Sequence, residues 1–223
     1  MNKLPFDAII FDHDGTLIDT ETPDFEACQI LCREHGLELS VEQWAASVVG
    51  RMEGYNQLFD DLLARHGKNH LTRDDLFRRI RQLWPITLEN TQLMPGVETL
   101  LPQLRTEGYR LAVATASDRP WATRWLTKFN LLSYFETLST GDDVANNKPA
   151  PDVYLHAAGQ LAVSPRRCLV FEDSLVGVQA AKAAGMTVVA VPTHVTRSLD
   201  FSLSDRVIAG LEHVTASWIA NLG

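Results

Sequence analysis

Basic residues, cysteines and long apolar runs are all scarce in this sequence. Lysine and arginine together number 20, against 28 aspartate and glutamate residues, and the formal net charge is −8. Nucleic acids and anionic membrane surfaces are bound through a basic face, so this balance argues against both as partners. A small anionic substrate remains compatible with it, because a local basic cluster can oppose the overall charge.

The apolar runs and the cysteines favour a cytoplasmic protein. No apolar run approaches the roughly 18 residues that a membrane-spanning helix needs. The first residues, MNKLPFDAIIFD, make a poor signal peptide, because their apolar run is short and ends in an acid. The three cysteines cannot all pair within the chain, and 223 residues can bury a sizeable core without disulfides. We expect a cytoplasmic protein that is a monomer or a weak homo-oligomer.

The periodicity of apolar residues changes along the chain and predicts the fold. After residue 94, strand-like runs alternate with helical patterns, which predicts crossover connections and a mostly parallel sheet with helices on both faces. Residues 19–84 show helical patterns without a convincing strand, and this stretch is too long for a loop. We predict an α/β fold, a doubly wound and mostly parallel sheet with an inserted all-helical domain. The predicted core is 1–16 with 93–223, and the predicted insert is 17–92.

Polar side chains stand at the carboxyl ends of the predicted strands, where open parallel sheets bind ligands. They are Asp12 and Asp14 after strand 6–11, Thr115 and Ser117 at the end of strand 109–117, Lys148 after strand 135–140, and Glu172, Asp173 and Ser174 after the run that begins at 167. Four carboxylates repel one another unless a divalent cation lies among them, and hard oxygen ligands suit Mg²⁺. An aspartate can also attack phosphorus, while lysine and threonine can hold the phosphoryl oxygens. The strand ends therefore predict a magnesium site for phosphoryl transfer.

Four motifs, in this order and at roughly this spacing, resemble the haloacid dehalogenase-like hydrolase superfamily. They are DHDGT at 12–16, ATAS at 114–117, KPAPD at 148–152 and FEDS at 171–174. The likeness is strongest to the branch of β-phosphoglucomutase and small sugar-phosphate phosphatases. It covers essentially the whole chain, including a helical cap after the first motif. The motifs are specific for the superfamily and carry no information about the substrate.

The resemblance implies a role for each acid of these motifs. Asp12 would be the nucleophile that accepts the phosphoryl group. Asp14 would first protonate the leaving oxygen and then activate water as a base. The backbone carbonyl of Asp14 would join Asp12 and Asp173 on Mg²⁺, with Glu172 beside them.

The resemblance also implies the residues that bind the substrate. Those in the core are Thr115, Ala116, Ser117 and Lys148, which would hold the phosphoryl oxygens and balance their charge. In the cap, the turn from Gly50 to Gly54 resembles the loop that contacts substrate, and Arg51 could pair there with a polar or anionic group. The cap would act as a lid, with hinges at 16–20 and 90–95.

We predict a magnesium-dependent phosphatase of a small phosphorylated metabolite, a sugar phosphate or related monophosphate. A phosphoglucomutase-type transfer is the first alternative, but a mutase usually carries a cap histidine about where this chain has Asp24. Hydrolysis of haloacids is less favoured, because a dehalogenase needs neither Asp14 nor Thr115. Hydrolysis of phosphonates is also less favoured, because those relatives typically carry alanine at the position of Asp14 and a Schiff-base lysine in the cap, where this sequence has only Lys68, in a segment expected to be an exposed loop. A non-catalytic binding protein is a further alternative, although it would have no reason to keep the whole set of motif residues.

Some side chains could either act in chemistry or simply pack. Side chains alternate along a strand, so His13 is expected to point away from Asp12 and Asp14 and to pack, with a contact to the leaving group as the alternative. Trp121 and Trp125 are expected in the core or at the cap interface. One predicted helix face carries Cys28, Cys32 and His35. Packing is a simpler interpretation of these residues than a soft-metal site, because no fourth ligand is evident.

Overall fold

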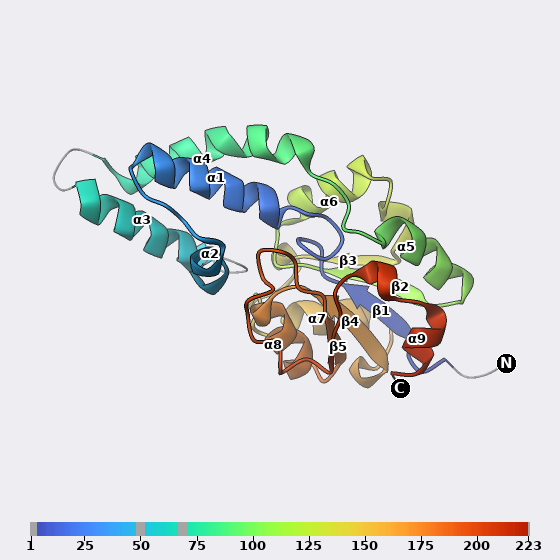
Figure 1. The fold of residues 1–223 in the computed structure, drawn as a ribbon. Coiled ribbons are helices and arrows are strands. Elements are labelled where there is room, and N and C mark those ends of the chain that lie inside the picture. Colours follow the sequence, from blue (N-terminus) through green and yellow to red (C-terminus); the bar gives the residue numbers. More distant parts are fainter. Residues whose placement is uncertain (1–3, 48–51, 67–70, 223) are drawn as a thin grey trace. The chain divides into compact units, whose positions relative to one another are not determined.

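The computed structural model describes residues 4–47, 52–66 and 71–222, and these fall into two compact units (Figure 1). Unit 1 comprises Met1–Ile18, Leu93–Thr193 and Asp200–Gly223. Unit 2 comprises Asp19–Gln92 and His194–Leu199. The short segment 194–199 lies outside the predicted insert, which ended at residue 92. Among the described residues, no helix is both long enough and apolar enough to cross a membrane.

Unit 1 is built on a six-stranded sheet in the order β3-β2-β1-β4-β5-β6, and every strand pairing in it is parallel. Its strands are β1 (Ala8–Phe11), β2 (Arg110–Ala114), β3 (Thr137–Ser139), β4 (Cys168–Glu172), β5 (Thr187–Ala190) and β6 (Arg206–Val207). Strands β1 and β4 are short runs, apolar except for Glu172 at the end of β4, and all of their residues are buried, as expected of a parallel sheet covered on both faces. The predicted α/β fold is confirmed.

The helices of unit 1 follow the strands in alternation (Figure 1). They are α5 (Val97–Thr106), α6 (Arg119–Lys128), α7 (Asp152–Gln160), α8 (Leu175–Ala183) and α9 (Ala216–Ala220). Helix α7 packs against β1, β2 and β3, and α8 packs against β4 and β5. Side-chain caps begin two of the helices near the carboxyl ends of the strands. Asp118 accepts from the backbone N–H of Trp121 at the start of α6, and Ser174 accepts from that of Gly177 at the start of α8.

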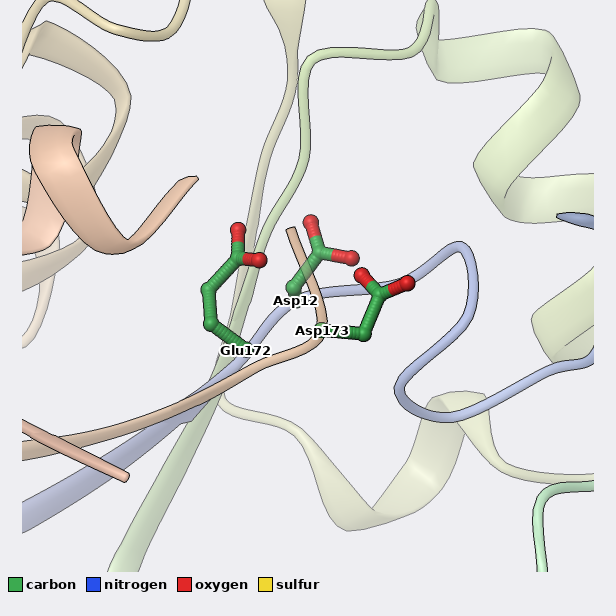
Figure 2. Close-up of side chains that lie close together, drawn as sticks. All are labelled: Asp12, Glu172 and Asp173. Atoms are coloured by element: carbon green, nitrogen blue, oxygen red, sulfur yellow. The ribbon is translucent and has the colours of Figure 1, made fainter. Parts of the chain in front are cut away.

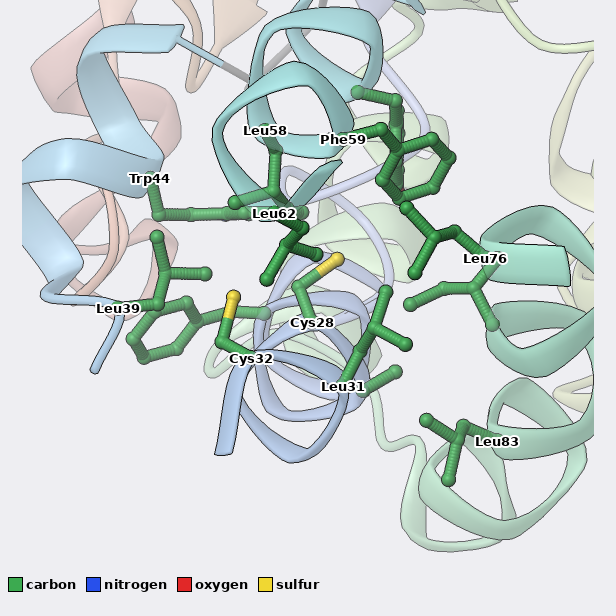
Figure 3. Packing of buried hydrophobic residues seen from close by; sticks show 14 of the residues in the cluster. Cys28, Leu31, Cys32, Leu39, Trp44, Leu58, Phe59, Leu62, Leu76 and Leu83 are labelled. Atoms are coloured by element: carbon green, nitrogen blue, oxygen red, sulfur yellow. The ribbon is translucent and has the colours of Figure 1, made fainter. Parts of the chain in front are cut away.

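The described residues of unit 2 between 19 and 92 are mostly helical, and its segment 194–199 forms turns. Its helices are α1 (Glu21–Glu34), α2 (Val41–Ser47), α3 (Met52–His66) and α4 (Arg73–Thr87). Their apolar faces form one core, in which Cys28 and Cys32 lie among leucine and aromatic side chains (Figure 3). Burial raises the pKa of both thiols, that of Cys32 to about 11, which disfavours the thiolate form. The expectation that these cysteines pack is confirmed.

Candidate active site

The register of the three central strands brings the sequence motifs to one edge of the sheet. Phe11, the last residue of β1, lies opposite Val113 of β2 and Phe171 of β4. The backbone N–H of Asp12 then donates to the carbonyl of Phe171 at 3.0 Å. The residues that follow β1, β2 and β4 are therefore neighbours in space, although they are far apart in the chain.

Three carboxylates gather at this edge, and Figure 2 shows them turned toward a common space. They belong to Asp12, Glu172 and Asp173, and one oxygen of each lies within 4.8 Å of the others. All three residues are buried, with exposures of 6%, 0% and 2%. Burial raises the pKa of Asp12; Lys148 opposes this shift, and the charge of Glu172 adds to it. Such a cluster is costly without a cation.

Lys148 supplies one positive charge to the cluster. Its Nζ forms an ion pair with Asp12 Oδ1 and another, at 2.7 Å, with Glu172 Oε1. Tyr154 places its ring 4.8 Å from this Nζ and donates its hydroxyl to Glu172 Oε1 at 2.9 Å. Burial lowers the pKa of Lys148, but the two carboxylates raise it more, so the net shift is upward and the ammonium stays charged.

Glu172 is held from both sides. Its Oε1 accepts from Lys148 and Tyr154, while its Oε2 accepts from the backbone N–H and the hydroxyl of Ser174, at 2.9 and 3.0 Å. Gly177 leaves room for this carboxylate, because a Cβ at that position would lie 1.5 Å from Oε1. The acid is thus fixed by its neighbours before any cation binds.

The donor set fits Mg²⁺. Asp12, Glu172 and Asp173 bring together three carboxyl groups, all of them hard oxygen donors, and the ammonium of Lys148 offsets only part of their charge. Gly15, with a φ of +76°, lets the chain turn beside Asp173, since a Cβ there would lie 2.2 Å from its Oδ2. The negative charge and the type of donor both suit a hard divalent cation.

The Asp14 side chain accepts hydrogen bonds from groups of a different motif. Ser117 Oγ donates to Asp14 Oδ2 at 2.7 Å, and Thr115 Oγ1 lies 3.4 Å from the same oxygen. Trp121 Nε1 donates to Oδ1 at 2.9 Å. Ser117, which the resemblance placed in substrate binding, thus contacts the predicted acid, and Trp121 joins the site rather than only packing.

His13 also approaches Asp14, and the expectation that it points away from both neighbours is wrong. Its Nδ1 lies 3.1 Å from Asp14 Oδ1, in a fully buried position. The reason is that β1 ends at Phe11, so strand alternation no longer governs residues 12–14. Burial lowers the pKa of His13, but Asp14 raises it more, and the net shift is upward.

Strand β2 is shorter than the predicted strand 109–117, and hydrogen bonds hold the loop that follows it. Strand β2 ends at Ala114, so Thr115 and Ser117 lie beyond it, and the Ser117 N–H donates to Thr115 Oγ1 at 3.0 Å. The carbonyl of Ala116 accepts from Asn147 Nδ2 at 2.8 Å. Asn147 was not singled out from the sequence, although it directly precedes the lysine of the third motif.

The predicted substrate residues Gly50 and Arg51 lie outside the described residues, and so does Lys68.

Known proteins resemble this chain in sequence and in fold. The sequence model of the haloacid dehalogenase-like hydrolases matches residues 9–191. The protein YhcW of Bacillus subtilis is 40% identical over 194 residues, which is 87% of each chain. The phosphorylated carbohydrates phosphatase of Thermotoga maritima is 33% identical over 182 residues, 81% of this chain and 82% of the relative.

A solved structure extends the likeness to the fold. The crystal structure of a mutant of CbbY from Rhodobacter sphaeroides, in complex with xylulose-(1,5)bisphosphate, matches with a TM-score of 0.72 and 29% identity. The match covers 93% of this chain and 96% of that one. The chain therefore belongs to the haloacid dehalogenase-like hydrolases, and it is a phosphoric monoester hydrolase of that family.

Proposed function

We propose that this enzyme hydrolyses small phosphorylated metabolites, sugar phosphates or related monophosphates, with Mg²⁺ and through an aspartyl-phosphate on Asp12. The observation that carries the proposal is the buried cluster in which Asp12 is paired with Lys148 beside Glu172 and Asp173. A carboxylate fixed among such groups can attack phosphorus, and the lysine balances the charge that the phosphate brings. The phosphatase in Thermotoga maritima and the CbbY complex support a phosphorylated carbohydrate as the substrate.

The chemistry divides into two displacements at phosphorus. In the first, an oxygen of Asp12 bonds to phosphorus while the ester bond breaks, and Asp14 gives its proton to the departing oxygen. In the second, Asp14 takes a proton from water, and the oxygen of that water bonds to phosphorus as the Asp12–phosphorus bond breaks. Inorganic phosphate leaves, and both aspartates return to their starting states.

Magnesium would be held by the carboxylates of Asp12 and Asp173 and by the backbone carbonyl of Asp14, with Glu172 beside them. When bound, it supplies positive charge that offsets the carboxylates and the phosphoryl oxygens. The residues of the β2 loop serve the same phosphoryl group. Thr115 and the amide of Ala116 would donate to its oxygens.

Asp24 of α1 supports hydrolysis over intramolecular transfer between two phosphate sites. Its Oδ1 accepts from Trp84 Nε1 at 2.7 Å, and its Oδ2 accepts from the hydroxyl of Tyr55. The carboxylate is thus held by side chains from α3 and α4. In the sequence it stands about where a mutase usually carries a cap histidine, and a carboxylate offers no positive charge to the second phosphate that a mutase must bind.

The test is phosphate release from a panel of sugar monophosphates, a sugar bisphosphate and a phosphorylated carboxylic acid. Wild type should release phosphate with Mg²⁺, lose this activity with a chelator and regain it when Mg²⁺ is restored. Asp12→Asn should remain folded and release none. Full activity of Asp12→Asn, or activity that no chelator affects, would contradict the proposal. A product with the phosphate moved to another position would instead favour the mutase.

A further inference from the structure

We propose that Trp121 is a positioning residue for the proton transfers of Asp14, acting through its indole N–H on Asp14 Oδ1. This inference rests on the proposed function, in which Asp14 is the acid and the base. The two residues are 107 positions apart in the chain, and the hydrogen bond between them is 2.9 Å long and partly buried. A partly desolvated bond to a carboxylate is among the stronger hydrogen bonds in proteins.

The donors on the two oxygens of Asp14 differ in kind. An indole N–H can only donate, so Oδ1 can accept from Trp121 whether or not Asp14 carries a proton. A hydroxyl can donate or accept, so Ser117, at 2.7 Å, remains a partner of Oδ2 in both states. Trp121 therefore helps to fix the plane of the carboxyl group through the whole cycle, together with His13, whose Nδ1 lies 3.1 Å from the same Oδ1. Oδ2 is left as the oxygen that gives and takes the proton.

The indole is itself held in place by the start of α6. The N-cap residue Asp118 accepts from the backbone N–H of Trp121 at 2.7 Å, which sets the first turn of the helix. The ring then meets Trp125 edge to face, with centroids 5.7 Å apart, and Trp125 is fully buried and stacked on Phe129. A rigid side chain on a capped helix can hold a carboxyl group more closely than a mobile one.

The test uses the leaving group of the substrate as its readout. Departure of a sugar alkoxide needs a proton from Asp14, whereas departure of acetate from acetyl phosphate does not. The quantity kcat/KM reports the step in which the ester bond breaks. Trp121→Phe keeps an aromatic ring and removes the N–H, so its kcat/KM for the sugar phosphate should fall about tenfold or more. Its kcat/KM for acetyl phosphate should change much less.

Trp44→Phe is the matched control, because it makes the same chemical change in the apolar core of unit 2 and leaves the contacts of Trp121 intact. The Trp44 Nε1, like that of Trp121, is an indole N–H, but it has no hydrogen-bond partner among the described residues. This variant should change kcat/KM for the two substrates by the same factor. Asp14→Asn stalls after its first displacement, so it is compared by the rate of a single turnover. In that comparison it should show the full selective loss on the sugar phosphate, and Trp121→Phe should show part of that loss.

Several kinetic results would contradict the inference or the function on which it rests. Trp121→Phe with kcat/KM unchanged for both substrates, or lowered equally for both, would show that Trp121 acts in packing or substrate binding only. Asp14→Asn without a selective loss would remove the acid role on which the inference depends. Wild type inactive on both substrates would contradict the proposed function itself, so the two failures are distinguishable.

A second measurement does not depend on the stability of a tryptophan variant. In nitrogen-15 spectra of the whole chain, Asp14→Ala should shift the indole N–H resonance of Trp121 and leave that of Trp44, in the core of unit 2, in place. An unmoved Trp121 resonance would overturn the hydrogen bond and the inference with it.

Discussion

The Lys148 ammonium owes its charge to its immediate surroundings. It is buried between the carboxylates of Asp12 and Glu172 and lies against the ring of Tyr154. Burial alone would favour the neutral amine, yet the pKa of Lys148 is raised, because two anions lie within ion-pair distance. Burial also raises the pKa of the Tyr154 phenol, which therefore keeps its proton and remains a donor to Glu172. The charge on Lys148 is thus available before a phosphate arrives.

A single glycine makes this arrangement possible, and Gly177→Ala tests it. The added methyl group would lie 1.5 Å from Glu172 Oε1, so the carboxylate must move away from Lys148 and Tyr154. We expect stability to fall by about 1–3 kcal/mol, as for other overpacked sites, and phosphate release to be largely lost.

The control for this substitution is Gly159→Ala in α7, where an added Cβ meets no atom within 4 Å. It should keep wild-type activity and raise stability by up to about 1 kcal/mol. Urea unfolding and phosphate release measure both effects. A fully active Gly177→Ala enzyme would show that the position of Glu172 does not matter.

At the scale of elements, the start of α8 links helix stability to the site. Ser174 accepts from the Gly177 N–H at 3.1 Å and donates its hydroxyl to Glu172 Oε2 at 3.0 Å. Ser174→Ala should cost about 1 kcal/mol as a lost cap and should also lower phosphate release. Thr215→Ala removes the equivalent cap of α9, where Thr215 accepts from the Trp218 N–H at 3.1 Å, and should cost stability alone. Equal activity losses in the two variants, compared by urea unfolding and initial rates, would refute a special role for the α8 cap.

The elements also show what a sequence can and cannot predict. The position of β1 and the meeting of the motifs at one sheet edge could be predicted, because apolar runs and parallel topology bring strand ends together. The bond from Trp121 to Asp14 could not, since it depends on the direction of one side chain across 107 positions. The orientation of His13 was mispredicted for a related reason. It required knowing that β1 ends at Phe11.

At the scale of the whole molecule, the chain crosses between the two units more often than the predicted single insertion requires. The segment 194–199 belongs to unit 2, where Val195 is fully buried in the apolar core and His194 Nδ1 lies 3.3 Å from Thr22 Oγ1. Nothing in its mostly polar sequence marks it as part of that core, so it could not be predicted. Because of this segment, the chain passes between the two units at 193/194 and 199/200 as well as at 18/19 and 92/93.

Val195→Ala tests whether this segment stabilises unit 2. Removing a fully buried side chain from a helical core should lower the free energy of unfolding by about 2 kcal/mol. Val207→Ala in β6 is the control, because Val207 is 55% exposed and its loss should cost little. Urea unfolding of both variants, followed by far-ultraviolet circular dichroism, measures the difference. Equal stabilities would show that the segment does not contribute to the core of unit 2.

The central claim, that Asp12 carries the phosphoryl group, is tested most directly by trapping the intermediate. Asp14→Asn should still be phosphorylated by acetyl phosphate with Mg²⁺, because acetate leaves without a proton, and should then stall without a base to activate water. Acid quenching and peptide mass spectrometry should find one phosphoryl group on the peptide that contains Asp12, and none when Asp12→Asn is added. Phosphate release by Asp14→Asn without any phosphopeptide, or a phosphoryl group on another residue, would contradict the account.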